Sequence, residues 1–295
     1  MNNEKIKVAS SSVLAAFFIT TFKLIVGLFT GSLGIISEAL HSGLDMLAAG
    51  ITYLSVKFSD KPADDDHNYG HGKIENLSAL VESILLLITC IWIIYEAINR
   101  LIFDDTQIDV SIWSYLVVIT SIVIDFSRSS ALMRVAKKFN SQALEADALH
   151  FTTDIWSSLV VLLGLVIYQF LGWHAADAVA SMIVACIVLY VAYKMGRKAI
   201  DILLDISPKD TLSTVKKILS EFPEISEYHD LKARTAGADT FIKFNLHLNT
   251  TMSLTEAHNL CDRIESRINK QISRSEVYIH PEPNDDSHHF TKTEY

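Results

Sequence analysis

The amino-acid sequence predicts an all-α membrane bundle of six transmembrane helices, followed by a small cytoplasmic α+β domain. Half of the 295 residues are hydrophobic. Up to about residue 200 they are gathered in long apolar blocks, which ordinary soluble domains do not contain. After about residue 205 the pattern changes to short segments with charged residues between them. We therefore divide the chain into a transmembrane domain (1–205), a soluble domain (206–283) and a tail expected to be disordered (284–295).

Six apolar segments make up the first part of the chain. They cover residues 8–30, 34–58, 76–102, 112–136, 143–171 and 176–200. Each is close to or above the roughly 20 residues that cross a bilayer. A cleaved signal peptide has a shorter apolar core and is followed by a soluble chain, so we interpret the first segment as a transmembrane helix. Lys23 lies near its far end, where a lysine can extend to the membrane surface.

Basic residues lie on one side of the predicted membrane. They are Lys57, Lys61 and Lys73 between the second and third segments, Arg128, Arg134, Lys137 and Lys138 around the end of the fourth, and Lys194, Arg197 and Lys198 at the end of the sixth. The loops at 103–109 and 171–177 contain no Lys or Arg. The positive-inside rule therefore predicts a multi-pass protein of the cell (inner, cytoplasmic) membrane with both termini in the cytoplasm.

The soluble domain has the expected order helix, strand, strand, helix, strand. The elements are a helix at 211–222, strands at 225–235 and 240–248, a helix at 253–271 and a strand at 277–280. Pro208 ends the last membrane helix, and Ser253 with Glu256 has the spacing of a capping box. This order predicts that both helices pack on one face of a sheet.

The second and fifth apolar segments each contain a histidine and an aspartate four residues apart. The pairs are His41 with Asp45 and His150 with Asp154. On a helix, side chains at this spacing lie on one face. Ionisable groups at membrane depth cost about 3 kcal/mol or more each and usually have a function. Two imidazoles and two carboxylates are a ligand set for a tetrahedral divalent metal such as Zn²⁺. The alternative is two independent polar patches that line the helix bundle.

Two further groups of histidines lie in the predicted cytoplasmic parts. In the loop after the second segment, acidic residues including Asp64 accompany His67 and His71, a combination that suits divalent metals. The alternative is a solvated acidic loop. The soluble domain contains five candidate ligands, namely His229, His247, His258, His280 and Glu282. They are candidates for another metal centre, and the alternative is scattered surface histidines.

Several classes of protein are excluded or disfavoured. The net charge of −9 and the lack of a dense Lys/Arg run argue against nucleic acid as a partner. No GxxxxGK[ST] motif is present, so we expect no nucleotide as an energy source and no organic cofactor. Three isolated cysteines form no CxxC pair. Without HExxH, and with four ligands that leave no open position, an intramembrane metalloenzyme is disfavoured. A membrane metal sensor without transport remains an alternative.

Taken together, these motifs resemble those of the cation diffusion facilitator family, which exports zinc and other divalent metals. The resemblance is to the bacterial ferrous-iron/zinc efflux type and covers nearly the whole chain. It is carried by the six segments, the HxxxD pairs in the second and fifth, the loop pattern Asp-Asp-x-His-x-x-Gly-His-Gly-Lys and the C-terminal α+β domain.

The resemblance implies a role for particular residues. It assigns the transport site to His41, Asp45, His150 and Asp154, and the loop site to Asp64, His67 and His71. It assigns a regulatory site in a metallochaperone-like, ferredoxin-like domain to His229, His258, His280 and Glu282. In this chain Asn245 stands where some members have a strand histidine, and His247 lies on the same strand face. The family also forms homodimers, with a charge interlock that falls on Lys73 and Asp205.

The expected function is export of Zn²⁺ by proton-coupled antiport through alternating access, so the chain is a secondary transporter and not an enzyme. Zn²⁺ would be both the transported and the regulatory ion. Metal binding needs neutral imidazole and ionised carboxylate, so the same four residues can hold either a metal ion or protons. The alternative is an exporter with a broader or different choice among Cd²⁺, Co²⁺, Fe²⁺ and Mn²⁺.

Overall fold

The computed structural model describes residues 2–30, 33–103, 112–171 and 175–284. The chain forms two compact units, Met1–Ile200 and Asp201–Tyr295. The tail that we expect to be disordered lies outside the described residues from 285 onward, as do residues 104–109 and 172–174 of the two loops that contain no Lys or Arg.

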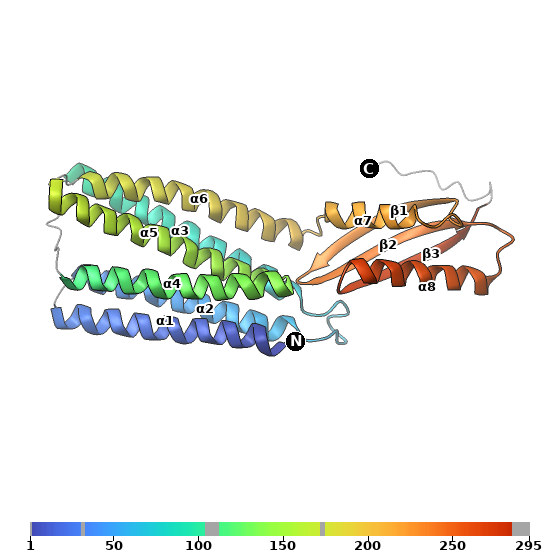
Figure 1. The fold of residues 1–295 in the computed structure, drawn as a ribbon, viewed down its shortest axis with the longest axis horizontal. Helices are drawn as coiled ribbons and strands as arrows, with labels where there is room; N and C mark the ends of the chain where they lie inside the picture. Colours follow the sequence, from blue (N-terminus) through green and yellow to red (C-terminus); the bar gives the residue numbers. More distant parts are fainter. Residues whose placement is uncertain (1, 31–32, 104–111, 172–174, 285–295) are drawn as a thin grey trace. The chain divides into compact units, whose positions relative to one another are not determined.

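The first unit is a bundle of six long helices, as predicted. They are α1 (Asn2–Thr30), α2 (Leu33–Ser59), α3 (Lys73–Phe103), α4 (Ile112–Phe139), α5 (Gln142–Leu171) and α6 (Ala175–Leu203). The helices run alongside one another (Figure 1). With 27 to 31 residues each, they are about 40 Å or more in length at 1.5 Å per residue, enough to cross a bilayer.

The surface of this bundle is apolar. Phe18, Phe29, Trp92 and Tyr190 are each more than 60% exposed, which is costly in water but suits contact with lipid. Within the described residues, three stretches are long and apolar enough to cross a membrane: Asn3–Phe29, Lys73–Asn99 and Tyr115–Phe139. The described bundle is therefore that of a membrane protein.

A buried ion cluster joins the helix ends that flank the loop at residues 60–72. Lys5 Nζ lies 2.7 Å from Glu75 Oε1 and 3.0 Å from Asp60 Oδ1. The hydroxyls of Ser59 and Ser141 also donate to the Glu75 carboxylate. These contacts connect α1 with the end of α2 and the beginnings of α3 and α5, and so fix both ends of the loop.

The second unit is an α+β domain with the predicted order of elements. It consists of α7 (Lys209–Leu219), β1 (Glu227–Ala236), β2 (Asp239–Leu248), α8 (Leu254–Gln271) and β3 (Ser275–Pro283). The sheet order is β1-β2-β3, with β1 antiparallel and β3 parallel to β2. Ser253 and Glu256 form the capping box of α8, as the spacing predicts.

One face of this sheet is covered by the helices. Phe244 and Leu246 of β2 are fully buried against Ile218 of α7 and Ile264 of α8. Because side chains alternate along a strand, Asn245 and the neighbouring odd-numbered positions lie on the opposite face. That face carries four of the five candidate ligands of the domain, His229, His247, His280 and Glu282.

Candidate metal centres

Helices α2 and α5 bring three of the four intramembrane candidates together. His150 Nε2 lies 3.1 Å from Asp45 Oδ1 and 3.5 Å from Asp154 Oδ2. One potential ligand atom from each of the three residues lies within 4.8 Å of the other two. Within the described part of the chain, the buried atoms His150 Nδ1 and Asp154 Oδ2 have no hydrogen-bond partner. Such a group of buried donors is suited to a divalent cation.

His41, the fourth candidate, lies beside this group but not within it. Its Nε2 atom is 4.0 Å from Asp45 Oδ1, and its side chain is 36% exposed, against 4% for His150. The spacing of four residues does place His41 and Asp45 on one helix face, as expected. A four-ligand site would require the His41 imidazole to move closer to the other three residues.

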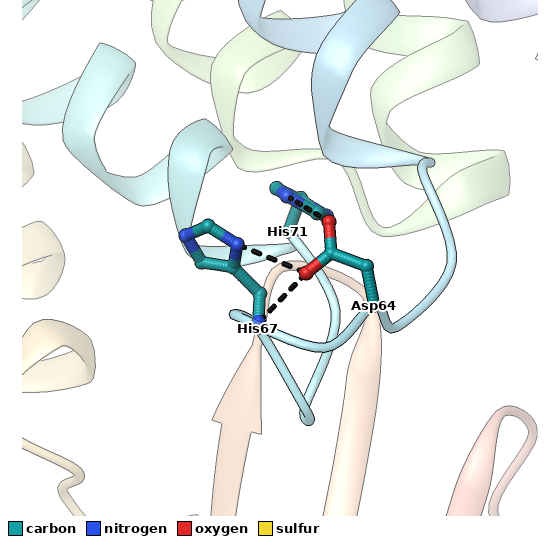
Figure 2. Close-up of side chains that lie close together, drawn as sticks. All are labelled: Asp64, His67 and His71. Carbon is teal, nitrogen blue, oxygen red and sulfur yellow. Dashed lines mark hydrogen bonds and ion pairs between the residues drawn. The ribbon is translucent and has the colours of Figure 1, made fainter.

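The loop candidates form a second group, shown in Figure 2. Asp64 Oδ1 accepts the backbone N–H of His67 at 2.7 Å and lies 3.1 Å from His67 Nδ1. Asp64 Oδ2 lies 3.4 Å from His71 Nε2. Gly70 has a φ of +73°, a conformation that favours glycine, and so lets the turn bring the two imidazoles together.

The carboxylate of this loop has an altered pKa. The backbone N–H of His67 lowers the pKa of Asp64 below its ordinary value, because the hydrogen bond stabilises the charged form. Asp64 is therefore ionised near neutral pH and available as a ligand. All three residues contribute atoms that lie within 4.8 Å of one another.

The soluble domain contributes a third group, whose composition is set by the strand register. Across the sheet, His229, Asn245 and His280 form one row, and Glu227, His247 and Glu282 form the next. Three residues from the two rows meet: His229, His247 and Glu282. Glu282 Oε2 lies 3.6 Å from His229 Nε2 and 3.5 Å from His247 Nε2.

The side chain of Asn245 lies within this third group. Its Nδ2 atom donates to Glu282 Oε1 at 2.9 Å and lies 3.2 Å from His229 Nε2. The amide therefore occupies the place between the two outer members of its row. An amide N–H₂ is a donor and not a metal ligand.

The other two predicted ligands of the domain are not part of this trio. His280 Nε2 lies 3.6 Å from Glu282 Oε1, with a side chain that is 53% exposed. His258 lies on α8, where its imidazole pairs with Asp262 at 3.6 Å and is 72% exposed. The structure thus brings together three of the five residues expected here.

The two residues of the expected charge interlock belong to different units, so their pairing remains a prediction. Within the second unit, Asp205 Oδ1 lies 3.5 Å from Arg234 Nη1.

Sequence reasoning missed several buried polar residues of the bundle. Glu82 and Asp147 are fully buried, and Lys23 is 5% exposed with its Nζ 2.8 Å from Ser42 Oγ. Lys23 therefore does not extend to the membrane surface as expected. The signal for these acids was present in the sequence, because Glu82 is a lone carboxylate within an apolar stretch and Asp147 lies one helical turn before His150.

Comparison with known proteins covers both units. A family model described as "Cation efflux transmembrane domain" matches residues 10–204, and one described as "Cation efflux protein, cytoplasmic domain" matches residues 207–284. The chain is 33% identical over 280 residues to the cation-efflux pump FieF of Shewanella oneidensis, covering 94% of each chain. It is 31% identical over 292 residues to the pump of the same name from Escherichia fergusonii, covering 96% of this chain and 95% of that protein.

Solved structures match the soluble domain. The metal-bound C-terminal domain of the CzcD transporter from Thermotoga maritima is 29% identical, with 25% of this chain and 87% of that chain covered and a TM-score of 0.25.

Proposed function

The chain belongs to the cation efflux family, the cation diffusion facilitators, and we propose that this divalent-cation efflux transporter exports Zn²⁺ in exchange for protons. The observation that carries the proposal is the close approach of Asp45, His150 and Asp154 between α2 and α5. His41 lies on the same face of α2 as Asp45 and supplies the fourth ligand. We name these four residues the transport site.

The ligand set supports Zn²⁺ as the cargo. Two imidazoles and two carboxylates suit Zn²⁺, which accepts tetrahedral nitrogen and oxygen ligands. Mn²⁺ prefers more oxygen ligands and higher coordination numbers. Co²⁺, Cd²⁺ and Fe²⁺ are the competitors at the same four residues.

The contacts of His150 support exchange with protons. Its Nε2 atom lies within 3.5 Å of a carboxylate oxygen on each of two helices. A metal ion at this place needs the imidazole neutral and both carboxylates ionised, so its arrival displaces protons and its departure allows them back. Alternating access would then expose the transport site first to the cytoplasm and afterwards to the other side.

The distribution of basic residues and the family membership support the orientation in the membrane, the homodimer and the regulatory metal sites. The protein would lie in the inner membrane, and the distribution of Lys and Arg supports an orientation with both termini in the cytoplasm. The family and its soluble domain support a homodimer. The loop group and the trio His229, His247 and Glu282 would bind regulatory Zn²⁺.

Flux measurements in sealed vesicles test the proposal. The purified protein is reconstituted with a zinc indicator and a pH indicator inside. Addition of Zn²⁺ should give zinc entry together with proton exit, and an imposed pH gradient should change the rate of entry. Zinc entry without any response to the pH gradient would disprove the exchange. No flux of any of Zn²⁺, Cd²⁺, Co²⁺, Fe²⁺ or Mn²⁺ would disprove transport, and competition among these ions gives the preference.

A further inference from the structure

Two carboxylates inside the bundle have no role in the transport site. Glu82 of α3 and Asp147 of α5 are both 0% exposed. One oxygen of each accepts a hydroxyl: Thr52 donates to Glu82 Oε1, and Ser12 donates to Asp147 Oδ2 at 3.3 Å. The other oxygens, Glu82 Oε2 and Asp147 Oδ1, have no hydrogen-bond partner among the residues that the structure describes. Buried carboxylate oxygens without partners are costly, which calls for an explanation.

The two carboxylates lie at the same level of the bundle. Near the beginnings of α3 and α5, Asn76 Nδ2 donates to Gln142 Oε1 at 2.8 Å. Further along, Ala79 of α3 and Ala146 of α5 share one apolar cluster, so the two helices run in the same direction. Glu82 lies six residues beyond Asn76, and Asp147 five beyond Gln142. The corresponding rises are about 9 and 8 Å, so the two acids lie at nearly the same height along neighbouring helices.

This level lies between the transport site and the loop at residues 60–72. Asp147 precedes His150 by three residues and so lies on the same face of α5, one turn nearer to the end where that helix begins. Thr52 follows Asp45 by seven residues on α2, which is two turns nearer to the loop. The two acids are thus one to two turns from the transport site, on its loop side.

We propose that Glu82 and Asp147 form a second, weaker cation site, at which the divalent ion stops on its way between the loop end of the bundle and the transport site. The proposal rests on the function proposed above. The donors are the two carboxylates and the hydroxyls of Thr52 and Ser12. Oxygen-only donors hold Zn²⁺ less firmly than a set with imidazoles, so the ion passes on to the transport site.

Arg128, which lies near Asp147, favours brief binding of the divalent ion at this second site over permanent binding. Arg128 Nη2 donates to Ser12 Oγ at 3.1 Å, and the same hydroxyl donates to Asp147. Asp125 Oδ1 lies 3.5 Å from Arg128 Nη1, and this ion pair partly neutralises the guanidinium charge. The positive charge beside Asp147 weakens the attraction for a cation, which lets the ion leave again.

Initial rates of Zn²⁺ uptake into vesicles test this site. The variants are Glu82→Gln and Asp147→Asn, which keep shape and hydrogen-bonding capacity but remove the charge. The control is Thr89→Val, also on α3, whose hydroxyl bonds only to its own helix at Leu85 among the described contacts. We expect the rate at subsaturating Zn²⁺ to fall about tenfold in both variants, with equilibrium affinity for Zn²⁺ in detergent changed less than about twofold. The control should match the unmodified protein.

The following outcomes decide whether the ion stops at Glu82 and Asp147. Rates within about twofold of the unmodified protein in both variants would overturn the inference. Unchanged zinc entry with reduced proton exit would also overturn it, because the acids would then carry protons and not the metal. If the unmodified protein moves no ion, the proposed function itself fails. Should a charge variant not fold, the variant Thr52→Val removes one hydroxyl ligand, which bonds to Glu82, and no charge. It should lower the rate in the same direction, and an unchanged rate would overturn the inference.

Discussion

The Nε2 atom of His150 lies 3.1 Å from Oδ1 of Asp45, and this contact joins α5 to α2 at the centre of the transport site. The two residues are 105 positions apart in the chain. A change in the spacing of α2 and α5 must therefore alter the coordination of any ion held between them. In the proposed exchange mechanism, this contact is one on which alternating access would act.

Removal of either aspartate of the transport site should abolish zinc flux. Asp45→Ala and Asp154→Ala each delete one of the close donor atoms, and a site with fewer ligands no longer holds the ion. Vesicle uptake assays measure the loss, and size-exclusion chromatography in detergent shows whether the protein remains folded.

The matched control for these variants is Thr21→Val on α1, whose hydroxyl bonds to Phe17 O of its own helix. It should transport normally. Flux close to normal in both aspartate variants would show that the transport site is assigned wrongly.

The order of the loop should be independent of pH near neutrality. Because the folded pKa of Asp64 is below its ordinary value, its contribution to loop order is complete above that ordinary value. The contribution is lost as pH falls through the lower, folded pKa. Amide-exchange protection of the His67 N–H, corrected for the intrinsic rate, should therefore be constant from about pH 7 to 5.

Asp64→Asn gives the comparison for this measurement. It removes the charge that accepts the His67 N–H and should lower the protection at every pH. Protection in the unmodified loop that falls steadily below about pH 7 would contradict the role of Asp64.

Asn245→His should raise the number of Zn²⁺ ions held by the soluble domain by about one. The substitution places an imidazole between His229 and His280 in their row across the sheet. The full chain is used, with Asp45→Ala and Asp64→Ala to weaken the other two groups, and bound zinc is counted by elemental analysis.

Lys243→His is the control for this count, because it adds a histidine to the same strand face one row away from the trio. It should leave the count unchanged. An equal rise in both variants would mean that any added histidine on this face binds zinc.

Lys5→Met should destabilise the bundle. The change leaves Glu75 buried without its cation, and breaking a buried pair costs about 3–5 kcal/mol. Thermal unfolding in detergent should shift to lower temperature, and zinc binding at the loop should weaken with it.

The double variant Lys5→Met/Glu75→Leu removes both charges and should recover much of the lost stability. If the double variant is as unstable as the single one, the ion pair is not the cause.

Much of the architecture could be predicted because it follows from local patterns. Apolar length gives the six helices, and the residue spacing of Ser253 and Glu256 gives the beginning of α8. The HxxxD spacing correctly puts His150 and Asp154 on one helix face.

Contacts between distant segments could not be predicted in this way. Lys23 is buried because Ser42 of another helix accepts its hydrogen bond, and the sequence does not say which face of α1 meets α2. Likewise, the register of the three strands places His247 and His229 next to the same carboxylate, that of Glu282. His258 of α8 is not part of this trio and pairs with Asp262. Such pairings depend on tertiary packing, which periodicity within one element does not contain.

The parallel pairing of β3 with β2 also has a consequence for biosynthesis. Glu282 lies on the last strand of the domain, whereas its two histidine neighbours lie on the first hairpin. A chain that stops after α8 would keep both imidazoles and lack the carboxylate between them. If the trio binds Zn²⁺ as proposed, the complete site can form only after residue 282 has been synthesised.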